Sequence, residues 1–327
     1  MSKKHRIIAT SVGLLAIALT LLLTGRLSAG EDDAKAEKAI KALGGKVVRS
    51  ADAPGRPIIS VEFLNAYVTD SGLKELAGLK SLQKLILVRA QVTDAGLKQL
   101  SGLKSLQTLD LGSTKVTDAG LKELAGLKSL QSLDLHSTSV TDVGFKEIAS
   151  FNGLRTLFLE DTRMTDAGLK ELASLKELES LLISATQVTD AGLKELAGLK
   201  SLKALWLRLA QVTDTGLKEL ASLTSLQYLY LEGTKVTGAG LKELGGLKSL
   251  QHLGLGGTNV TDARLKELAG LKSLQYLWLD GTKVTDAGLK NLAGLTSLRL
   301  LDLTGTQVTD AGMAELRKAL PECKISR

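Results

Sequence analysis

Hydrophobic residues recur along the chain with a period of 24 residues, most clearly in the stretch from Leu106 to Ser129. Its sequence is LQTLDLGSTKVTDAGLKELAGLKS, and close copies follow one another from Ile58 to near the C-terminus. The triplet Val-Thr-Asp marks most copies, beginning at Val68, Val92, Val116, Val140, Val188, Val212, Val260, Val284 and Val308, with variants at Met164 and Val236. Eleven units in one unbroken register predict a solenoid.

Within one unit the spacing of the apolar residues changes. Leu106, Leu109 and Leu111 follow the pattern L-x-x-L-x-L, whereas the later apolar residues come mainly at three-residue steps. This change predicts a short strand followed by a short helix. The Thr-Asp pair before the second half is a helix-start signal, because its oxygens can accept hydrogen bonds from free backbone N–H groups. The acid also lies at the positive end of the helix dipole.

The order strand, helix, strand predicts a curved array. Each crossover returns the chain to a parallel neighbouring strand and makes the coil right-handed. Strands stack about 4.8 Å apart, whereas helices approach no closer than roughly 8 to 10 Å. The sheet should therefore line the inner, concave face and the helices the outer, convex face. A single unit is too small to fold alone, so stability should come from stacking.

At this point the sequence resembles a known family. The run Leu106-x-x-Leu109-x-Leu111-x-x-Thr114-x-Val116 is similar to the leucine-rich-repeat consensus L-x-x-L-x-L-x-x-[N/C]-x-L. The following T-D-x-G-L-x-x-L resembles the ribonuclease-inhibitor-like and F-box-associated subgroup, and the near-identical units resemble bacterial, planctomycete-type secreted repeat proteins. The resemblance implies an α/β right-handed solenoid, or horseshoe, with a parallel sheet on the concave face and short helices on the convex face.

The chain departs from that consensus at the Asn/Cys position. Threonine occupies it in most units, and alanine occupies it at Ala66, Ala90 and Ala210. A threonine hydroxyl can still satisfy a backbone group of the turn, but alanine cannot. A second recurrent residue, the glycine of T-D-x-G-L, is replaced by Arg264 in one unit, so it cannot require a positive φ. We interpret this glycine as a close-packing position and not as part of a phosphate-binding loop.

The chain divides into three predicted regions. Residues 1–29 have a basic start, an uncharged run at residues 7–25 and the small residues of a cleavage site, which predicts a signal peptide or a signal anchor. An uncleaved run could span a bilayer and tether the protein. Either outcome places the repeats outside the cytoplasm, as a secreted or periplasmic, cell-envelope protein.

Residues 30–57 differ in composition from the repeats and predict an N-terminal cap. A helix at residues 34–43 would turn Ala36, Ile40 and Leu43 to one side, and Lys46 to Arg49 would add a strand. A linker or a partner-docking helix is the alternative. Residues 58–327 form the solenoid of eleven units, closed by a short C-terminal cap with a helix from Met313 and a strand near Cys323.

Charge and cysteine content exclude several classes of function. The net charge is +7, but it falls to +3 without the four basic residues of the leader. Lysine alternates with glutamate on the predicted helices, which is typical of a solvated face. No basic stripe lies on the predicted concave face, so we expect no nucleic-acid partner and membrane contact only through an uncleaved N-terminal segment. The single cysteine, Cys323, allows no internal disulfide.

Aromatic residues concentrate on the predicted concave face. The chain has ten of them, and six lie beside the second leucine of a strand, where alternation turns side chains to the solvent. Exposed contiguous aromatic surface usually marks a contact site. We therefore predict a ligand-binding strip made of Phe158, Leu182, Trp206, Arg208, Tyr228, Tyr230, Glu232, His252, Tyr276, Trp278 and Asp280.

The ligand class stays open at this stage. A protein or peptide fits a broad apolar strip with a polar rim. A glycan is the alternative, with sugar rings stacked on Tyr and Trp around a dip floored by Gly254, Gly256 and Gly257. A further alternative is that these side chains only cover one another. The repeat resemblance also implies a ubiquitin-ligase substrate adaptor, but the region before the first unit is too short for an F-box domain.

Enzymatic chemistry is not predicted. Asp110 and Asp134 occupy the same slot of neighbouring strands, with His136 and Glu160 nearby, and this set resembles a hydrolase pair or a metal site. The same residues are ordinary polar filling of a solvent-facing sheet, and no nucleophile stands beside a base. We expect no catalytic residue, no metal site and no cofactor.

Overall fold

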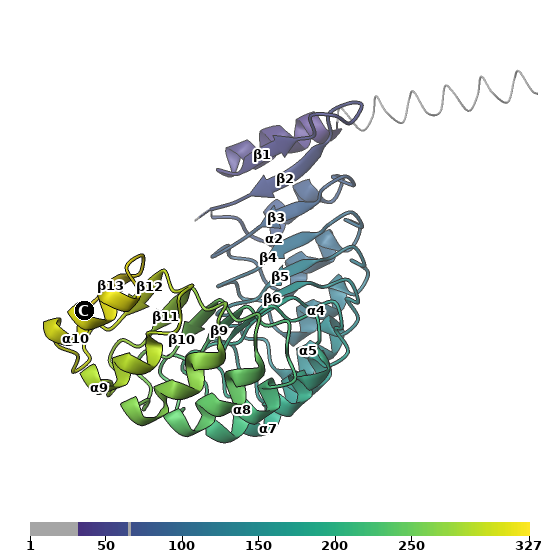
Figure 1. The fold of residues 1–327 in the computed structure, drawn as a ribbon. Coiled ribbons are helices and arrows are strands. Elements are labelled where there is room, and N and C mark those ends of the chain that lie inside the picture. Colours follow the sequence, from purple (N-terminus) through teal and green to yellow (C-terminus); the bar gives the residue numbers. More distant parts are fainter. Residues whose placement is uncertain (1–31, 65–66) are drawn as a thin grey trace, which may run out of the picture.

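The computed structural model describes residues 32–64 and 67–327, which form one curved array. A single 13-stranded sheet runs through it in chain order. The strands line the inner face of the arc and the helices lie on its outer face (Figure 1). The predicted α/β solenoid is therefore confirmed.

The strands recur once per unit with the register of the sequence repeat. Strand β1 (Lys46–Arg49) pairs antiparallel with β2 (Ile58–Glu62), and every later pair is parallel. Leu109, for example, pairs with Leu85 and Leu133. The remaining strands are β3 (Lys84–Ile86), β4 (Thr108–Asp110), β5 (Ser132–Asp134), β6 (Thr156–Phe158), β7 (Ser180–Leu182), β8 (Ala204–Trp206), β9 (Tyr228–Tyr230), β10 (His252–Gly254), β11 (Tyr276–Trp278), β12 (Leu300–Asp302) and β13 (Lys324–Ser326).

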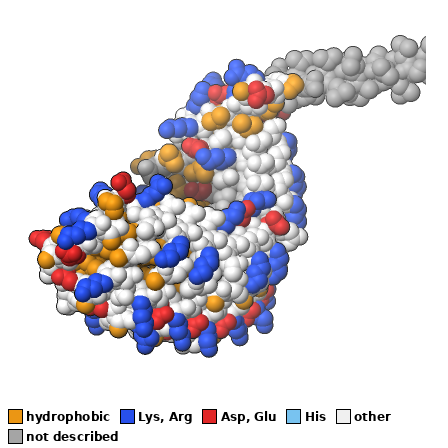
Figure 2. Space-filling view, viewed as in Figure 1, with side chains coloured by type: hydrophobic (Ala, Val, Ile, Leu, Met, Phe, Trp, Pro, Cys, Tyr) orange, Lys and Arg blue, Asp and Glu red, His pale blue; other side chains and the backbone are white. Residues whose placement is uncertain are grey.

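The convex elements are short and mix α-helical with 3₁₀ geometry. The α-helices are α2 (Asp70–Leu73), α3 (Asp94–Leu97), α4 (Asp118–Leu124), α5 (Asp142–Ile148), α6 (Asp166–Leu172), α7 (Asp190–Leu193), α8 (Asp214–Leu220), α9 (Asp286–Leu289) and α10 (Asp310–Ala319). The 3₁₀ helices are η1 (Lys74–Leu76), η2 (Lys98–Leu100), η3 (Lys194–Gly198), η4 (Gly238–Gly246), η5 (Asp262–Gly270) and η6 (Lys290–Leu292). Basic and acidic side chains are interspersed along this outer face (Figure 2).

Threonine replaces the consensus asparagine by bonding within its own turn. The Thr114 hydroxyl donates to the Leu111 carbonyl at 2.6 Å, and both groups are buried. The same bond is made by Thr138, Thr162, Thr186, Thr234, Thr258, Thr282 and Thr306. The predicted role of the hydroxyl is confirmed. Ala90 and Ala210 offer no such group, and Ala66 lies outside the described residues.

The aspartate of the Thr-Asp pair links neighbouring units. Asp94 accepts hydrogen bonds from the Thr117 backbone N–H at 2.8 Å and from the Thr117 hydroxyl at 2.7 Å, one unit further on. The Thr117 hydroxyl in turn accepts from the Ala119 N–H, as the helix-start signal predicts. We call this aspartate–threonine pair a rung. Further rungs start at Asp70, Asp118, Asp142, Asp166, Asp190, Asp214, Asp262 and Asp286.

The repeated glycine gives the rung its space. A Cβ on Gly120 would overlap the Asp94 carboxylate, and its φ is not positive, so the predicted close packing is confirmed. One junction departs from the pattern. Gly238 replaces the aspartate, and the side chain of Arg264 fills the space where a Cβ on Gly238 would lie. In the described chain, Thr261 has no side-chain cap bond at this junction.

The turn after each concave strand contains the left-handed residue of the unit. Here φ is positive at Arg89, Ser113, Ser137, Asp161, Ala185 and Leu209 and then at Gly233, Gly257, Gly281 and Gly305. Only the last four units therefore have the residue type that adopts this conformation without strain. This backbone conformation was not predicted from the sequence.

Further short elements lie at both ends of the array. A helix at residues 32–42 buries Ala36 and Ile40, and Ile40 lies against Phe63 of the first unit near Gly45. Leu43 follows that helix and stays partly exposed, although its side chain reaches Gly72 of the first unit. Helix α10 and strand β13 cover the other end. The predicted leader, residues 1–29, lies outside the described residues, among which no helix is long and apolar enough to cross a membrane.

Candidate binding site on the concave face

The predicted strip lies on the concave sheet. Strand pairing places Phe158 beside Leu182, Leu182 beside Trp206, and Trp206 beside Tyr230. Hydrophobic side chains gather in the hollow of the arc (Figure 2). Phe158, Leu182 and all the aromatic rings of the strip are half-buried, so each leaves part of its surface to solvent.

Six rings from β8 to β11 form one contiguous group, which we call the aromatic cluster: Trp206, Tyr228, Tyr230, His252, Tyr276 and Trp278. Trp206 stacks on Tyr230 with centroids 5.2 Å apart, and Tyr230 lies 5.8 Å from Trp278. In the second row His252 lies between Tyr228 at 4.5 Å and Tyr276 at 4.3 Å. The rings therefore cover one another in part, as the alternative interpretation held, but not completely.

His252 is a neutral member of this cluster. Burial between the two tyrosines lowers the pKa of its imidazole below the usual value. Its Nδ1 atom is buried without a hydrogen-bond partner among the described residues. The ring therefore acts as an aromatic spacer between Tyr228 and Tyr276.

The predicted dip at β10 is closed, so the arrangement of a sugar ring seated on its glycine floor is wrong. Gly254 has no side chain, and Tyr230 and Trp278 lean toward each other across it. Gly254 and Gly256 are buried, because the Glu232 carboxylate lies over the first and the Asp280 carboxylate over the second. These glycines make room for rings and carboxylates of the neighbouring strands.

A shallow pocket of about 500 Å³ opens beside the cluster, at the carboxyl ends of the strands. It is lined by Arg208, Leu209, Glu232, Gly233, Trp278, Asp280 and Asp302. The predicted rim residues meet here, and the structure adds Leu209 and Asp302 to them. Leu209 was detectable in the sequence as a large apolar residue in a turn that otherwise carries small or polar ones.

One ion pair is already formed at this pocket. Arg208 donates from Nε to Glu232 Oε2 at 3.1 Å and from Nη2 to Glu232 Oε1 at 3.0 Å. Its guanidinium carbon lies 4.9 Å from the centre of the Tyr230 ring. Asp280 and Asp302, by contrast, have no cation within salt-bridge distance in the described part of the chain.

Asp302 is held as an anion. Burial acts to raise the pKa of its carboxyl, but hydrogen bonds from the Thr304 hydroxyl and backbone outweigh this effect and lower the pKa. The pocket therefore keeps this negative charge at neutral pH.

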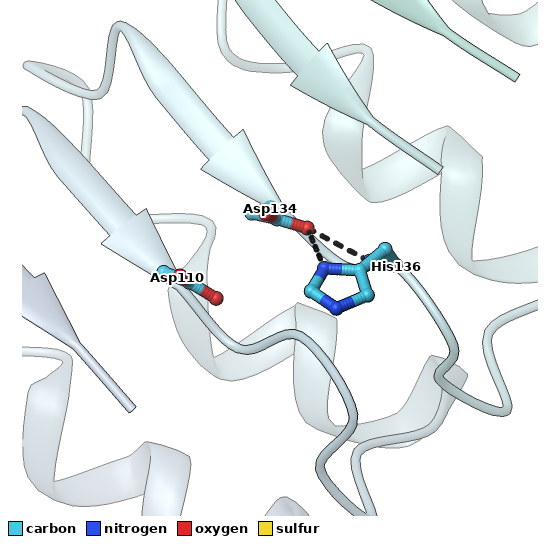
Figure 3. Close-up of side chains that lie close together, drawn as sticks. All are labelled: Asp110, Asp134 and His136. Carbon is cyan, nitrogen blue, oxygen red and sulfur yellow. Dashed lines mark hydrogen bonds and ion pairs between the residues drawn. The ribbon is translucent and has the colours of Figure 1, made fainter. Parts of the chain in front are cut away.

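A second polar group lies on β4 and β5 (Figure 3). Asp110, Asp134 and His136 offer ligand atoms within 4.8 Å of one another, as the sequence predicts. The Asp134 carboxylate bonds the His136 ring at 2.8 Å, and each aspartate accepts a backbone N–H two residues on. Burial raises the pKa of Asp110 and of nearby Glu160. Such a set could hold a cation, but one oxygen of each carboxylate already accepts a hydrogen bond from its turn.

Two segments of the chain match the sequence pattern of a known repeat. Residues 80–140 and residues 294–316 each match a family model described as leucine-rich repeat. No curated protein matches the chain in sequence.

Several solved structures share the fold. An internalin of Listeria monocytogenes is 20% identical, with a TM-score of 0.62 over 89% of this chain and 93% of the internalin. A leucine-rich-repeat protein of Leptospira interrogans is 26% identical, with a TM-score of 0.59 over 78% of this chain and 74% of that protein. A TDR receptor is 18% identical, with a TM-score of 0.60 over 82% of this chain and 46% of the receptor.

Proposed function

We propose that the chain is a binding scaffold for a polypeptide, as its leucine-rich-repeat fold and its two matched segments support. The aromatic cluster is the contact surface. This proposal rests on one observation: six half-exposed rings are contiguous on the concave sheet.

The chemistry of the cluster supports a polypeptide partner. Trp, Tyr and Arg are the side chains that most often dominate binding energy in protein interfaces. Here Trp206, Tyr230 and Trp278 are fixed by stacking on one another, so they lose little freedom when a partner covers them. The extended concave surface of a solenoid offers room for a chain to lie along it.

We place this activity outside the cytoplasm. The proposal rests on the sequence of residues 1–29, with its basic start and apolar run, which is typical of an export signal. It includes both fates of that segment, cleavage and retention as a tether through residues 7–25.

The other functions are less well supported. A glycan would have to bind without the predicted gap at Gly254. A ubiquitin-ligase adaptor rests on the resemblance of the repeats alone. At Asp110, Asp134 and His136 the carboxylates serve the turns and no nucleophile is positioned, so we propose no catalytic role.

Site-directed crosslinking tests the proposal. A photoreactive phenylalanine analogue at Trp206 should capture a specific polypeptide when the protein is exported in its native cell envelope. The same analogue at Val143, which is 65% exposed on the convex helix α5, reports non-specific neighbours.

The outcomes are distinct. A polypeptide captured from Trp206 and not from Val143 supports the proposal. Identical captures from both positions, or captured material that contains only glycan, would refute it. Loss of the specific capture in Trp278→Ala would extend the contact to the far side of the cluster.

A further inference from the structure

The pocket beside the aromatic cluster has an unmatched negative charge. Glu232 is neutralised by Arg208, whereas Asp280 and the ionised Asp302 have no cationic partner in the described chain. The charges on the pocket lining therefore sum to minus two, with Arg208 as the only cation among those lining residues. Charge complementarity calls for a cation in the partner.

The apolar walls of the same pocket select the kind of cation. One wall is the half-buried indole of Trp278, and the other is Leu209, which is 66% exposed. Leu209 has a φ of 58°, a conformation that is costly for a leucine and that the next four units give to glycine. A ligand with an apolar stem and a charged head matches both walls.

Another part of the repeat array shows how an arginine can be bound between an aromatic ring and a carboxylate. Arg208, Tyr230 and Glu232 form a guanidinium stacked over a ring and paired with a carboxylate. Two units later, 48 residues on, the corresponding positions are Gly256, Trp278 and Asp280. The ring and the carboxylate are present there, and the arginine is missing.

We propose that the polypeptide partner supplies this arginine. Its guanidinium stacks on the Trp278 indole and pairs with Asp280 and Asp302, while its methylene stem lies against Leu209. A guanidinium suits this site better than an ammonium, because it is planar, stacks on aromatic faces and pairs with carboxylates through a fork of N–H groups. This inference rests on the proposed function, since it identifies the partner residue that enters the same concave site.

Blocked pentapeptides test the site directly. The probe is acetyl-Gly-Gly-Arg-Gly-Gly-amide, compared with versions that carry lysine or citrulline at the centre, and the readout is the fluorescence of Trp278 in a Trp206→Phe background. We expect saturable binding of the arginine peptide, at least about fivefold weaker binding of the lysine peptide and none of the uncharged citrulline peptide.

Variants of the pocket locate the binding. Asp280→Asn should weaken the arginine peptide about tenfold or more, because a charge-assisted pair is lost. Asp161→Asn, the same change at an exposed aspartate in the turn after β6, should alter binding less than twofold. Gly256→Arg should also abolish binding, since it places the missing arginine on the chain itself; equal urea midpoints would show that each variant is folded.

Equal binding of the three peptides, or equal loss in Asp280→Asn and Asp161→Asn, would overturn the proposal. Its failure is distinguishable from failure of the proposed function. If crosslinking from Trp206 captures a polypeptide whose yield is unchanged by Asp280→Asn, the binding scaffold stands and the arginine pocket does not. If nothing specific is captured while the peptide discriminates as expected, the pocket stands alone.

Discussion

At the scale of single residues, the turn after each concave strand combines a fixed backbone with a variable side chain. Its left-handed residue is alanine, serine, aspartate, arginine or leucine in six units and glycine in the last four. A non-glycine residue pays a steric cost in this conformation. Six units therefore keep a strained backbone at this position, whereas the glycine of the last four units relieves the strain.

Ala185→Gly should stabilise the protein by about 1 kcal/mol, because φ at this residue is 54° and glycine removes the clash of the Cβ. Urea denaturation measures the change. Ala191→Gly is the matched control: the same substitution in the first turn of α7 should destabilise by about 0.5 to 1 kcal/mol. Equal effects at both positions would contradict the assignment of strain to the turn.

Asp110→Asn should increase stability at neutral pH. Burial raises the pKa of Asp110 above its ordinary value of 3.8, so the folded state binds this proton more tightly than the unfolded state does. The wild type therefore loses stability as the pH rises from 3.8 through the folded pKa, and asparagine does not. Chemical denaturation from pH 3.5 to 7 should show the advantage of the variant shrinking toward acid.

Asp302→Asn is the control, because it should change the stability at neutral pH in the opposite direction. The pKa of Asp302 is lowered in the folded protein, so its contribution to stability is present above the ordinary value and is lost as the pH falls through the folded pKa. This variant should be less stable than the wild type at neutral pH. A pH-independent difference in either variant would show that titration is not the cause.

At the scale of elements, the rungs explain two conserved features of the repeat within this one chain. Each aspartate bonds the threonine of the next unit, and the glycine three residues after that threonine leaves room for the carboxylate. Gly238 and Arg264 are the two exceptions, and they face each other across one junction. The units on either side of it also have wholly 3₁₀ elements, η4 and η5.

Replacing Gly238 by aspartate and Arg264 by glycine should create a rung at this junction. Gly238→Asp alone should destabilise by about 1 to 3 kcal/mol, because the new side chain overlaps Arg264. Combined with Arg264→Gly it should gain two hydrogen bonds to Thr261, so that the double variant exceeds the sum of the single variants by about 1.5 kcal/mol or more. Additive effects in urea denaturation would contradict the linkage.

The sequence shows that Gly238 and Arg264 each depart from the repeat, but it does not show that the two residues are in contact. Arg264 is visible as a glycine replaced, and Gly238 as an aspartate replaced, but they are 26 residues apart and belong to different units. The 24-residue register aligns equivalent positions, whereas a rung joins positions 23 residues apart. The helix-start interpretation of the aspartate therefore covered only its own unit.

At the scale of the whole molecule, periodicity was sufficient to predict the array and the face of every strand residue. Strict alternation placed Trp206, Tyr230 and Trp278 on the solvent side of the sheet, and in the structure they are half-exposed beside buried leucines. The shape of the site was not predictable in the same way. Whether rings leave a gap over Gly254 depends on their side-chain rotations, and the lean of Tyr230 and Trp278 closed it.

Removal of residues 30–57 should expose the first unit of the array. The helix at residues 32–42 and strand β1 cover β2, and Ile40 lies near Phe63. Without them an apolar edge strand is free to pair with another chain. We expect self-association in light scattering and a lower melting temperature. The point variant Ile40→Asp should show the same trend with the chain length unchanged, and a monomeric, equally stable deletion would contradict the cap.

The junction between η4 and η5, which has no rung, should be the weakest point of the array when force is applied to its ends. The described junctions from Asp70 to Thr309 are tied by carboxylates on the helix side, except the one between η4 and η5. On the sheet side, that joint is crossed by the contacts of Tyr228 with His252 and of Tyr230 with Trp278. Pulling the two ends apart should open this seam first. A ligand that contacts both Tyr230 and Trp278 would bridge this junction. Ligand binding should therefore raise the force needed to separate the two units at the weakest junction of the array.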